Sequence, residues 1–155
     1  MTKDSDFKQV VRTRMAETGE TYTAARAAVQ ASRSPHQESY DAARAEQERL
    51  VGRLFRDGRI ERVPARRKVR AAVLLEVLRR FEPGRDYSEP EVNGVLLGVH
   101  EDFAYLRREL VNYHYLDREA GRYRTAEHAP ERSAIERQEI PAWEEHWLEG
   151  FLGGR

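Results

Sequence analysis

The residues of this sequence that could do chemistry are mostly arginines, gathered in three places. One set lies at residues 66–70, a second between residues 105 and 112, and a third between residues 122 and 124. Arginine neutralises phosphate and can also bind the edge of guanine through two hydrogen bonds, as asparagine can bind adenine. We therefore expect a nucleic-acid-binding surface composed of Arg66, Arg67, Lys68, Arg70, Tyr105, Arg107, Arg108, Asn112, Arg122 and Arg124.

The distribution of charge leaves a second interpretation open. The 27 basic and 27 acidic residues give a formal net charge of zero, but residues 51–86 contain 11 basic and only 5 acidic residues. A basic segment is typical of nucleic-acid binders. It is also typical of a solvated helix face whose counter-charges lie nearby. Carboxylates accompany Arg107 and Arg108 on their own segment, and either arginine could instead pair with a core carboxylate such as Glu91.

Residues that commonly carry catalysis or hold metals form no recognisable pattern in this chain. There is no cysteine, and none of the five histidines belongs to a His-x-x-x-His pair. Neither a glycine-rich phosphate loop nor a Gly-x-Ser-x-Gly motif is present. The run His100-Glu101-Asp102 is more typical of a helix-capping turn than of a metal site. We therefore expect neither an enzyme nor a protein with a metal or cofactor.

Residues 59–126 contain the elements that would position the arginines. Apolar spacing predicts a strong helix over Ala65–Phe81. Ser88, followed three residues later by Glu91, is the capping-box signature of a second helix. A third helix is predicted within the stretch DFAYLRRELVNYHYL (residues 102–116), where apolar residues recur at helical spacing.

Short strands complete the predicted core. Residues 59–65 are expected to be extended, as are Asp86-Tyr87, and residues 115–125 read as two strands around a turn at Gly121. Helix, short strand, two further helices and a hairpin is the order of a winged helix-turn-helix. In that fold the third helix can enter the major groove of DNA, and the hairpin, or wing, can lie along the backbone.

Helical extensions are predicted on both sides of this core. Residues 1–34 are expected to form two short helices, Phe7–Gly19 and a second one capped by Thr21 or Thr23 and broken at Ser34-Pro35. Residues 35–58 are expected to form a linking helix from about Gln37 to Arg56, ended by Asp57-Gly58. Residues 127–155 would form a tail whose amphipathic helix packs on the core or on a second subunit through Trp143, Trp147, Leu148 and Phe151. The predicted fold class is mainly α with a small β-wing.

Two stretches of the sequence resemble a known family. They are LFRDGRIERVPARRKVRAAVLLEVLRRFEPGRDYSEPEVNGVL and LRRELVNYHYLDREAGRYR, and within them FEPGRDYSEPEVN is especially specific. Over residues 50–125 the chain resembles the domain of unknown function 2087 family, a bacterial winged-helix-like group. The resemblance implies a transcriptional regulator. Family members often end the last motif with Tyr-Trp-Arg, whereas Arg124 follows Tyr123 directly here.

Together these observations predict a cytoplasmic winged-helix protein that binds double-stranded DNA and regulates transcription. Homodimers are expected to be possible, because many helix-turn-helix proteins bind two half-sites. The alternative is a module that binds a protein, an RNA or a ribonucleoprotein through the same scaffold; zero net charge and an acidic tail favour it. A membrane partner is not expected, since no apolar run approaches the ~20 residues of a membrane span.

Overall fold

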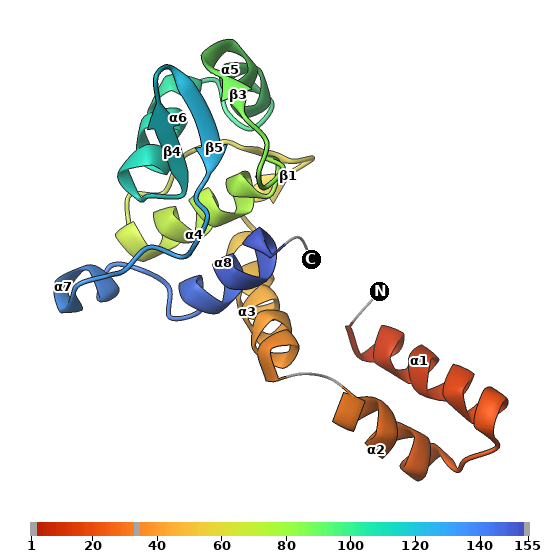
Figure 1. The fold of residues 1–155 in the computed structure, drawn as a ribbon. Helices are drawn as coiled ribbons and strands as arrows, with labels where there is room; N and C mark the ends of the chain where they lie inside the picture. Colours follow the sequence, from red (N-terminus) through yellow and green to blue (C-terminus); the bar gives the residue numbers. More distant parts are fainter. Residues whose placement is uncertain (1–2, 33–34, 154–155) are drawn as a thin grey trace. The chain divides into compact units, whose positions relative to one another are not determined.

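The computed structural model describes residues 3–32 and 35–153, which are mainly helical with two small antiparallel sheets (Figure 1). The chain divides into two compact units, Met1–Glu38 and Ser39–Arg155. Each unit is described by itself. The boundary between them falls inside a helix, two residues before the first buried side chain of the second unit, Tyr40.

The first unit is a helical hairpin made of α1 (Lys3–Thr18) and α2 (Tyr22–Ser32). Gly19, with a φ of 76°, lets the chain leave α1 in the left-handed region, and its N–H donates to the Met15 carbonyl at 2.9 Å. The hydroxyl of Thr21 accepts from the Ala24 N–H at 3.3 Å, so Thr21 is the cap of the second helix. On α1, Val11 is fully buried whereas Val10 is exposed. The predicted break at Ser34-Pro35 includes a residue outside the described part.

The linking helix α3 (Pro35–Val51) ends five residues before the predicted Arg56. β1 (Phe55–Arg56) and β2 (Arg59–Ile60) follow as an antiparallel hairpin. Asp57 and Gly58 join them with φ values of 52° and 78°, a pair of left-handed residues that matches the twist of a two-residue hairpin turn. The prediction of a helix to Arg56 was therefore wrong, because Asp-Gly here makes a strand turn. The expected strand over residues 59–65 also ends early, at Ile60.

Three helices build the core: α4 (Arg67–Leu78), α5 (Glu89–Leu97) and α6 (Phe103–Asn112). α4 is shorter than the predicted Ala65–Phe81 at both ends, and it is nearly encircled by the core because all but one residue from Ala71 to Leu78 is buried. The capping box of α5 is confirmed. Its Ser88 hydroxyl accepts from the Glu91 N–H at 3.3 Å, and the Glu91 carboxylate accepts from the Ser88 N–H at 3.2 Å.

The second sheet has three strands, β3 (Tyr87–Ser88), β4 (Leu116–Glu119) and β5 (Arg122–Thr125), in the order β3-β5-β4. The predicted hairpin is confirmed, with Ala120 and Gly121 in the left-handed region at its turn. Its pairing with β3 was not predicted: Tyr87 lies opposite Tyr123, and the Tyr87 ring meets Phe81 edge-on at 5.1 Å. The strand before α5 is thus tied to the hairpin after α6.

The C-terminal segment returns across the core through α7 (Ala134–Arg137) and α8 (Glu144–Leu152). Trp147 and Leu148 of α8 are buried, and Gly150 lies so close to the Tyr40 ring of α3 that a Cβ there would overlap it. The buried amide of Gln47 on α3 donates to the Ala72 carbonyl of α4 and accepts from the Trp143 indole at 2.8 Å. α3 and α8 therefore belong to the same core as α4.

Candidate nucleic-acid interface

Helix α6 presents one face to the core and another to solvent. Leu106 and Leu110 are fully buried, while Arg108 and Asn112 are exposed and Tyr105 is half-buried. Residues three and four apart share a helix face, so these last three side chains lie along one side of α6. The helix begins at an Asp102 cap, whose carboxylate accepts from the Tyr105 N–H at 3.2 Å.

The two arginines of α6 differ in their partners. Arg107 turns toward α5, where its guanidinium donates to the Asn93 amide oxygen and lies 3.7 Å from the Glu89 carboxylate. Arg108 makes no hydrogen bond or ion pair with any residue in the described ranges. The pairing that the sequence left open is thus made by Arg107, and its partner is Glu89 rather than Glu91. Asn112 donates to Glu109 at 3.3 Å on its own helix.

The basic set at the start of α4 is partly neutralised. Arg67 pairs with Glu139 of the C-terminal segment. Arg70 is half-buried, with its Nε atom 3.7 Å from the Glu109 carboxylate and 3.4 Å from the Tyr113 hydroxyl. The Tyr113 hydrogen bond raises the pKa of Arg70. The other two cations, Arg66 and Lys68, are exposed and unpaired among the described residues.

Carboxylates also face the arginines of the β4-β5 hairpin. Directly opposite residues of an antiparallel pair share a face of the sheet, and the register sets Arg124 opposite Asp117 and Arg122 opposite Glu119. Arg124 is paired with Asp86 at 2.9 Å, whereas the Arg122 side chain forms no ion pair within the described ranges.

The other face of the β4-β5 hairpin carries Tyr123, whose hydroxyl donates to Glu89 at 3.0 Å. Arg118 lies opposite Tyr123, with its guanidinium carbon 5.8 Å from the centre of the tyrosine ring. Burial and the bond to Glu89 raise the pKa of Tyr123. This tyrosine therefore packs beneath the hairpin and ties it to α5, while Arg118 remains exposed at the edge of the same face.

Carboxylates therefore interrupt all three predicted sets of cations. Arg67, Arg70, Arg107 and Arg124 are held by acidic partners, and Asn112 is bonded to one. The predicted cations without an ion-pair partner in the described part of the chain are Arg66, Lys68, Arg108 and Arg122.

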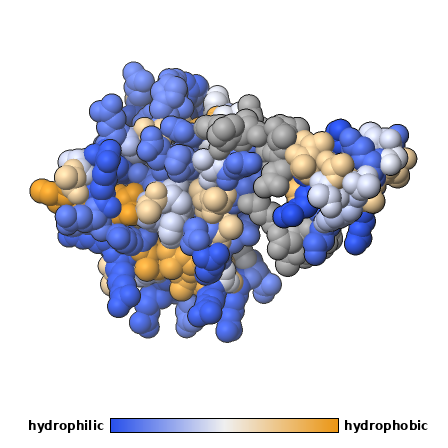
Figure 2. All heavy atoms as spheres, turned by 90° about the horizontal axis from the view of Figure 1, so that it is seen from below, coloured by the Kyte–Doolittle hydropathy of each residue, from blue (hydrophilic) through white to orange (hydrophobic). Residues whose placement is uncertain are grey.

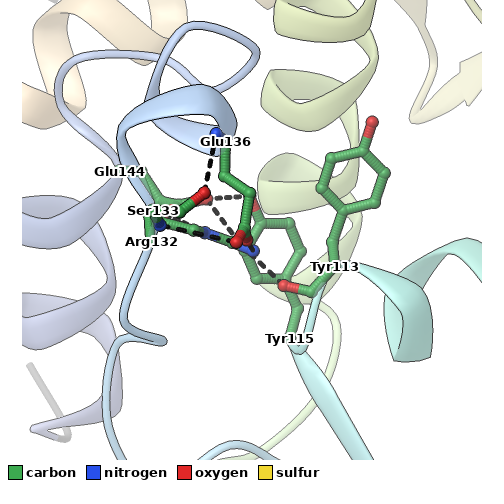
Figure 3. Close-up of polar contacts among 6 residues, drawn as sticks. All are labelled: Tyr113, Tyr115, Arg132, Ser133, Glu136 and Glu144. Atoms are coloured by element: carbon green, nitrogen blue, oxygen red, sulfur yellow. Dashed lines mark hydrogen bonds and ion pairs between the residues drawn. The ribbon is translucent and has the colours of Figure 1, made fainter.

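Sequence reasoning missed a buried polar cluster beside this surface, which Figure 3 shows in close-up. The guanidinium of Arg132 donates to both oxygens of Glu144 at 3.0 Å and to the Tyr113 carbonyl at 2.7 Å. The Tyr115 hydroxyl donates to the same carboxylate. Burial, reinforced by Glu144, raises the pKa of Tyr115 well above its usual value. No local sequence pattern indicates that Arg132 and Glu144 pair, because both are ordinary charged residues in a chain that is rich in charged residues.

A pocket of about 260 Å³ separates the start of α4 from the C-terminal segment. Its lining includes Arg67, Arg70, Arg132, Glu136 and Glu139. In the described part of the chain, no three His, Cys, Asp or Glu side chains gather as metal ligands. Among residues 3–32 and 35–153, no helix is both long and apolar enough to pass through a bilayer.

Comparison with known families gives a match to only part of the chain. Residues 59–125 match a family described as "Uncharacterized protein conserved in bacteria (DUF2087)". The resemblance predicted from the sequence is therefore confirmed for that region, while residues 50–58 lie outside it. The matched region runs from β2 to the end of β5 and excludes α3, α7 and α8. No curated protein matches the chain, and no solved structure matches it.

Proposed function

We propose that the second unit contains a winged helix-turn-helix that binds double-stranded DNA and regulates transcription. The observation that carries this proposal is the order α4-β3-α5-α6-β4-β5 together with the sheet order β3-β5-β4. In a winged helix, the strand between the first two helices pairs with the returning strand of the wing. This pairing fixes the wing beside the third helix, so both can contact one duplex.

Helix α6 is the element proposed to enter the major groove. Its solvent face carries Tyr105, Arg108 and Asn112, which include hydrogen-bond donors suited to base edges. Arg108 is the central residue of this face, and no carboxylate of the described chain has to be displaced before it binds DNA. Arg107 has a different role in the proposal, because its bonds to Asn93 and Glu89 hold α6 against α5.

The electrostatic footprint that remains is small. The proposed cations are Arg66, Lys68, Arg108 and Arg122, and if each displaces one condensed counterion the logarithm of the binding constant falls with the logarithm of salt with a slope of about −4. Four such contacts make a small electrostatic contribution to the affinity of a single protomer. We propose that two protomers bind two half-sites, as helix-turn-helix proteins commonly do, to reach a regulator's affinity.

The test is a fluorescence anisotropy titration with labelled duplex fragments of the source genome at about 50 mM salt, where phosphate contacts are strongest. Arg108→Ala should weaken binding by about five- to one hundred-fold, the range for losing one good base contact. Arg79→Ala is the matched control, because Arg79 is exposed at the far end of α4 and already pairs with Glu76. Absence of binding by the unmodified protein at this salt concentration refutes the proposal.

The alternative of a protein-binding module has less support. Exposed tryptophans would favour a protein partner, but Trp147 is 2% exposed and Trp143 is half-buried with its indole bonded to Gln47. In the second unit, the large hydrophobic side chains that are exposed among the described residues are Leu97 and Ile135. Figure 2 shows mostly hydrophilic side chains on one face, interrupted by a hydrophobic patch in the lower middle of the view. The carboxylates on the wing remain the feature that favours a protein partner.

A further inference from the structure

An acidic stretch of the C-terminal segment lies against the basic start of α4. Glu139 pairs with Arg67, and Glu136 lines the same pocket as Arg67, Arg70 and Arg132. A carboxylate on a guanidinium occupies the hydrogen-bonding edge that a phosphate would use. The contact joins residues 72 positions apart, so it depends on how the tail returns across the core (Figure 1).

The C-terminal segment has two contacts of very different burial, a buried one that we call its base and an exposed one that we call its acidic tip. At its base, the side chains of Arg132 and Glu144 are 8% and 5% exposed and share two hydrogen bonds at 3.0 Å. At its acidic tip, Arg67 and Glu139 are 62% and 40% exposed and share a single contact. Water and salt weaken exposed pairs strongly and buried pairs little. The tip can therefore be displaced by a competing anion while the base stays in place.

The short helix α7 keeps this tip acidic and ordered. Ser133 caps it, and the Glu136 carboxylate accepts from the Ser133 N–H at 3.4 Å, in a capping box like that of α5. Hydrogen bonds from Ser133 lower the pKa of Glu136. Arg132 lies 3.6 Å from the same carboxylate and links the tip to the buried base.

We propose that residues 134–139 form an autoinhibitory cover that competes with the phosphates of DNA for the start of α4. This inference rests on the proposed DNA binding and goes beyond it, because it assigns a regulatory role to a segment outside the matched family region. The cover is part of the chain, so its effective concentration at Arg67 is high even though the contact is weak. When a phosphate displaces Glu139, Arg67 joins the four unpaired cations.

Glu139→Gln tests the cover because it removes the charge and keeps the shape. It should tighten binding to a short labelled duplex by about two- to five-fold, the factor equivalent to one exposed ion pair. Glu131→Gln is the control for net charge alone: Glu131 is exposed, lies on the same segment and has no ion pair within the described ranges.

A double variant separates a specific cover from a general charge effect. In an Arg67→Ala background, Glu139→Gln should no longer tighten binding, since the residue that it uncovers is gone. A gain that persists in that background, or an equal gain from Glu131→Gln, overturns the cover. If the unmodified protein binds DNA and Glu139→Gln binds no more tightly, the cover is overturned and the proposed function stands. If no variant binds DNA, both are overturned.

Discussion

The buried pair of Arg132 and Glu144 should be the most sensitive polar contact in the second unit. Arg132→Met keeps most of the side-chain volume but removes the charge, leaving the Glu144 carboxylate buried with one donor, the Tyr115 hydroxyl. It also leaves the Tyr113 carbonyl without the donor now at 2.7 Å. Removing one member of a buried ion pair costs about 3–5 kcal/mol, because the remaining charge has lost its compensation.

The burial of the pair sets the size of this effect. Both side chains are less than one-tenth exposed, so solvent can replace little of the lost interaction. In Arg132→Met with Glu144→Gln, no buried charge remains and the glutamine oxygen can still accept from Tyr115. The double variant should therefore be more stable than Arg132→Met alone by about 2 kcal/mol, since neutral replacements of a buried pair are much better tolerated than half of one.

Urea unfolding followed by tryptophan fluorescence measures these free energies directly. Both tryptophans of the chain, Trp143 and Trp147, flank Glu144 in the sequence and lie in the second unit, so the signal does not report on α1 and α2. The melting temperature of Arg132→Met should fall by about 10 °C, at roughly 2–4 °C per kcal/mol for a chain of this size. A loss below about 1 kcal/mol, or a double variant no more stable than the single one, would refute the reasoning.

Three further substitutions test the helix cap and the helix packing. Ser88→Ala removes the cap of α5 and should lower the free energy of unfolding by about 1 kcal/mol in the same urea assay. The Ser88 N–H and hydroxyl hold the pKa of Glu91 below its usual 4.5. The stability that this carboxylate contributes is therefore present above pH 4.5 and is lost as pH falls through the lowered pKa. In thermal melts at acid pH, Glu91→Gln should lose less stability with falling pH than the unmodified protein does. Gly150→Ala places a Cβ about 2.1 Å from the Tyr40 ring and should cost about 1–3 kcal/mol, measured by urea unfolding; an unchanged midpoint would mean that α8 shifts freely on α3.

The parts of the fold that were predicted correctly have local causes. The capping box at Ser88 and Glu91, the apolar spacing of α6 and the turn at Gly121 each depend on residues within a few positions of one another. Such signals act before tertiary contacts form, so a sequence displays them. The pair Asp57-Gly58 is compatible with two local structures, a helix end and a hairpin turn. A helix end and a two-residue hairpin turn both use left-handed residues, and only the pairing of Phe55 with Ile60 selects the hairpin.

The candidate site was harder to predict because ion pairs depend on the whole fold. The sequence places arginines on the outer faces of α6 and the wing, but it does not state which carboxylate meets each one. Arg107 has acidic neighbours on its own helix and pairs instead with Glu89 of α5. Arg67 pairs with Glu139, which lies in the C-terminal segment that follows β5. The register that sets Glu119 opposite Arg122 likewise depends on which residues the two strands pair.

The amide of Gln47 has a practical consequence for anyone expressing part of this protein. The family match begins at residue 59, but a fragment starting there would lack the side chain that binds the Ala72 carbonyl and the Trp143 indole. It would also lack Tyr40, which fills the space above Gly150. Such a fragment would expose hydrophobic core residues and aggregate during purification, whereas a fragment spanning residues 39–153 would retain the whole hydrophobic core of the second unit.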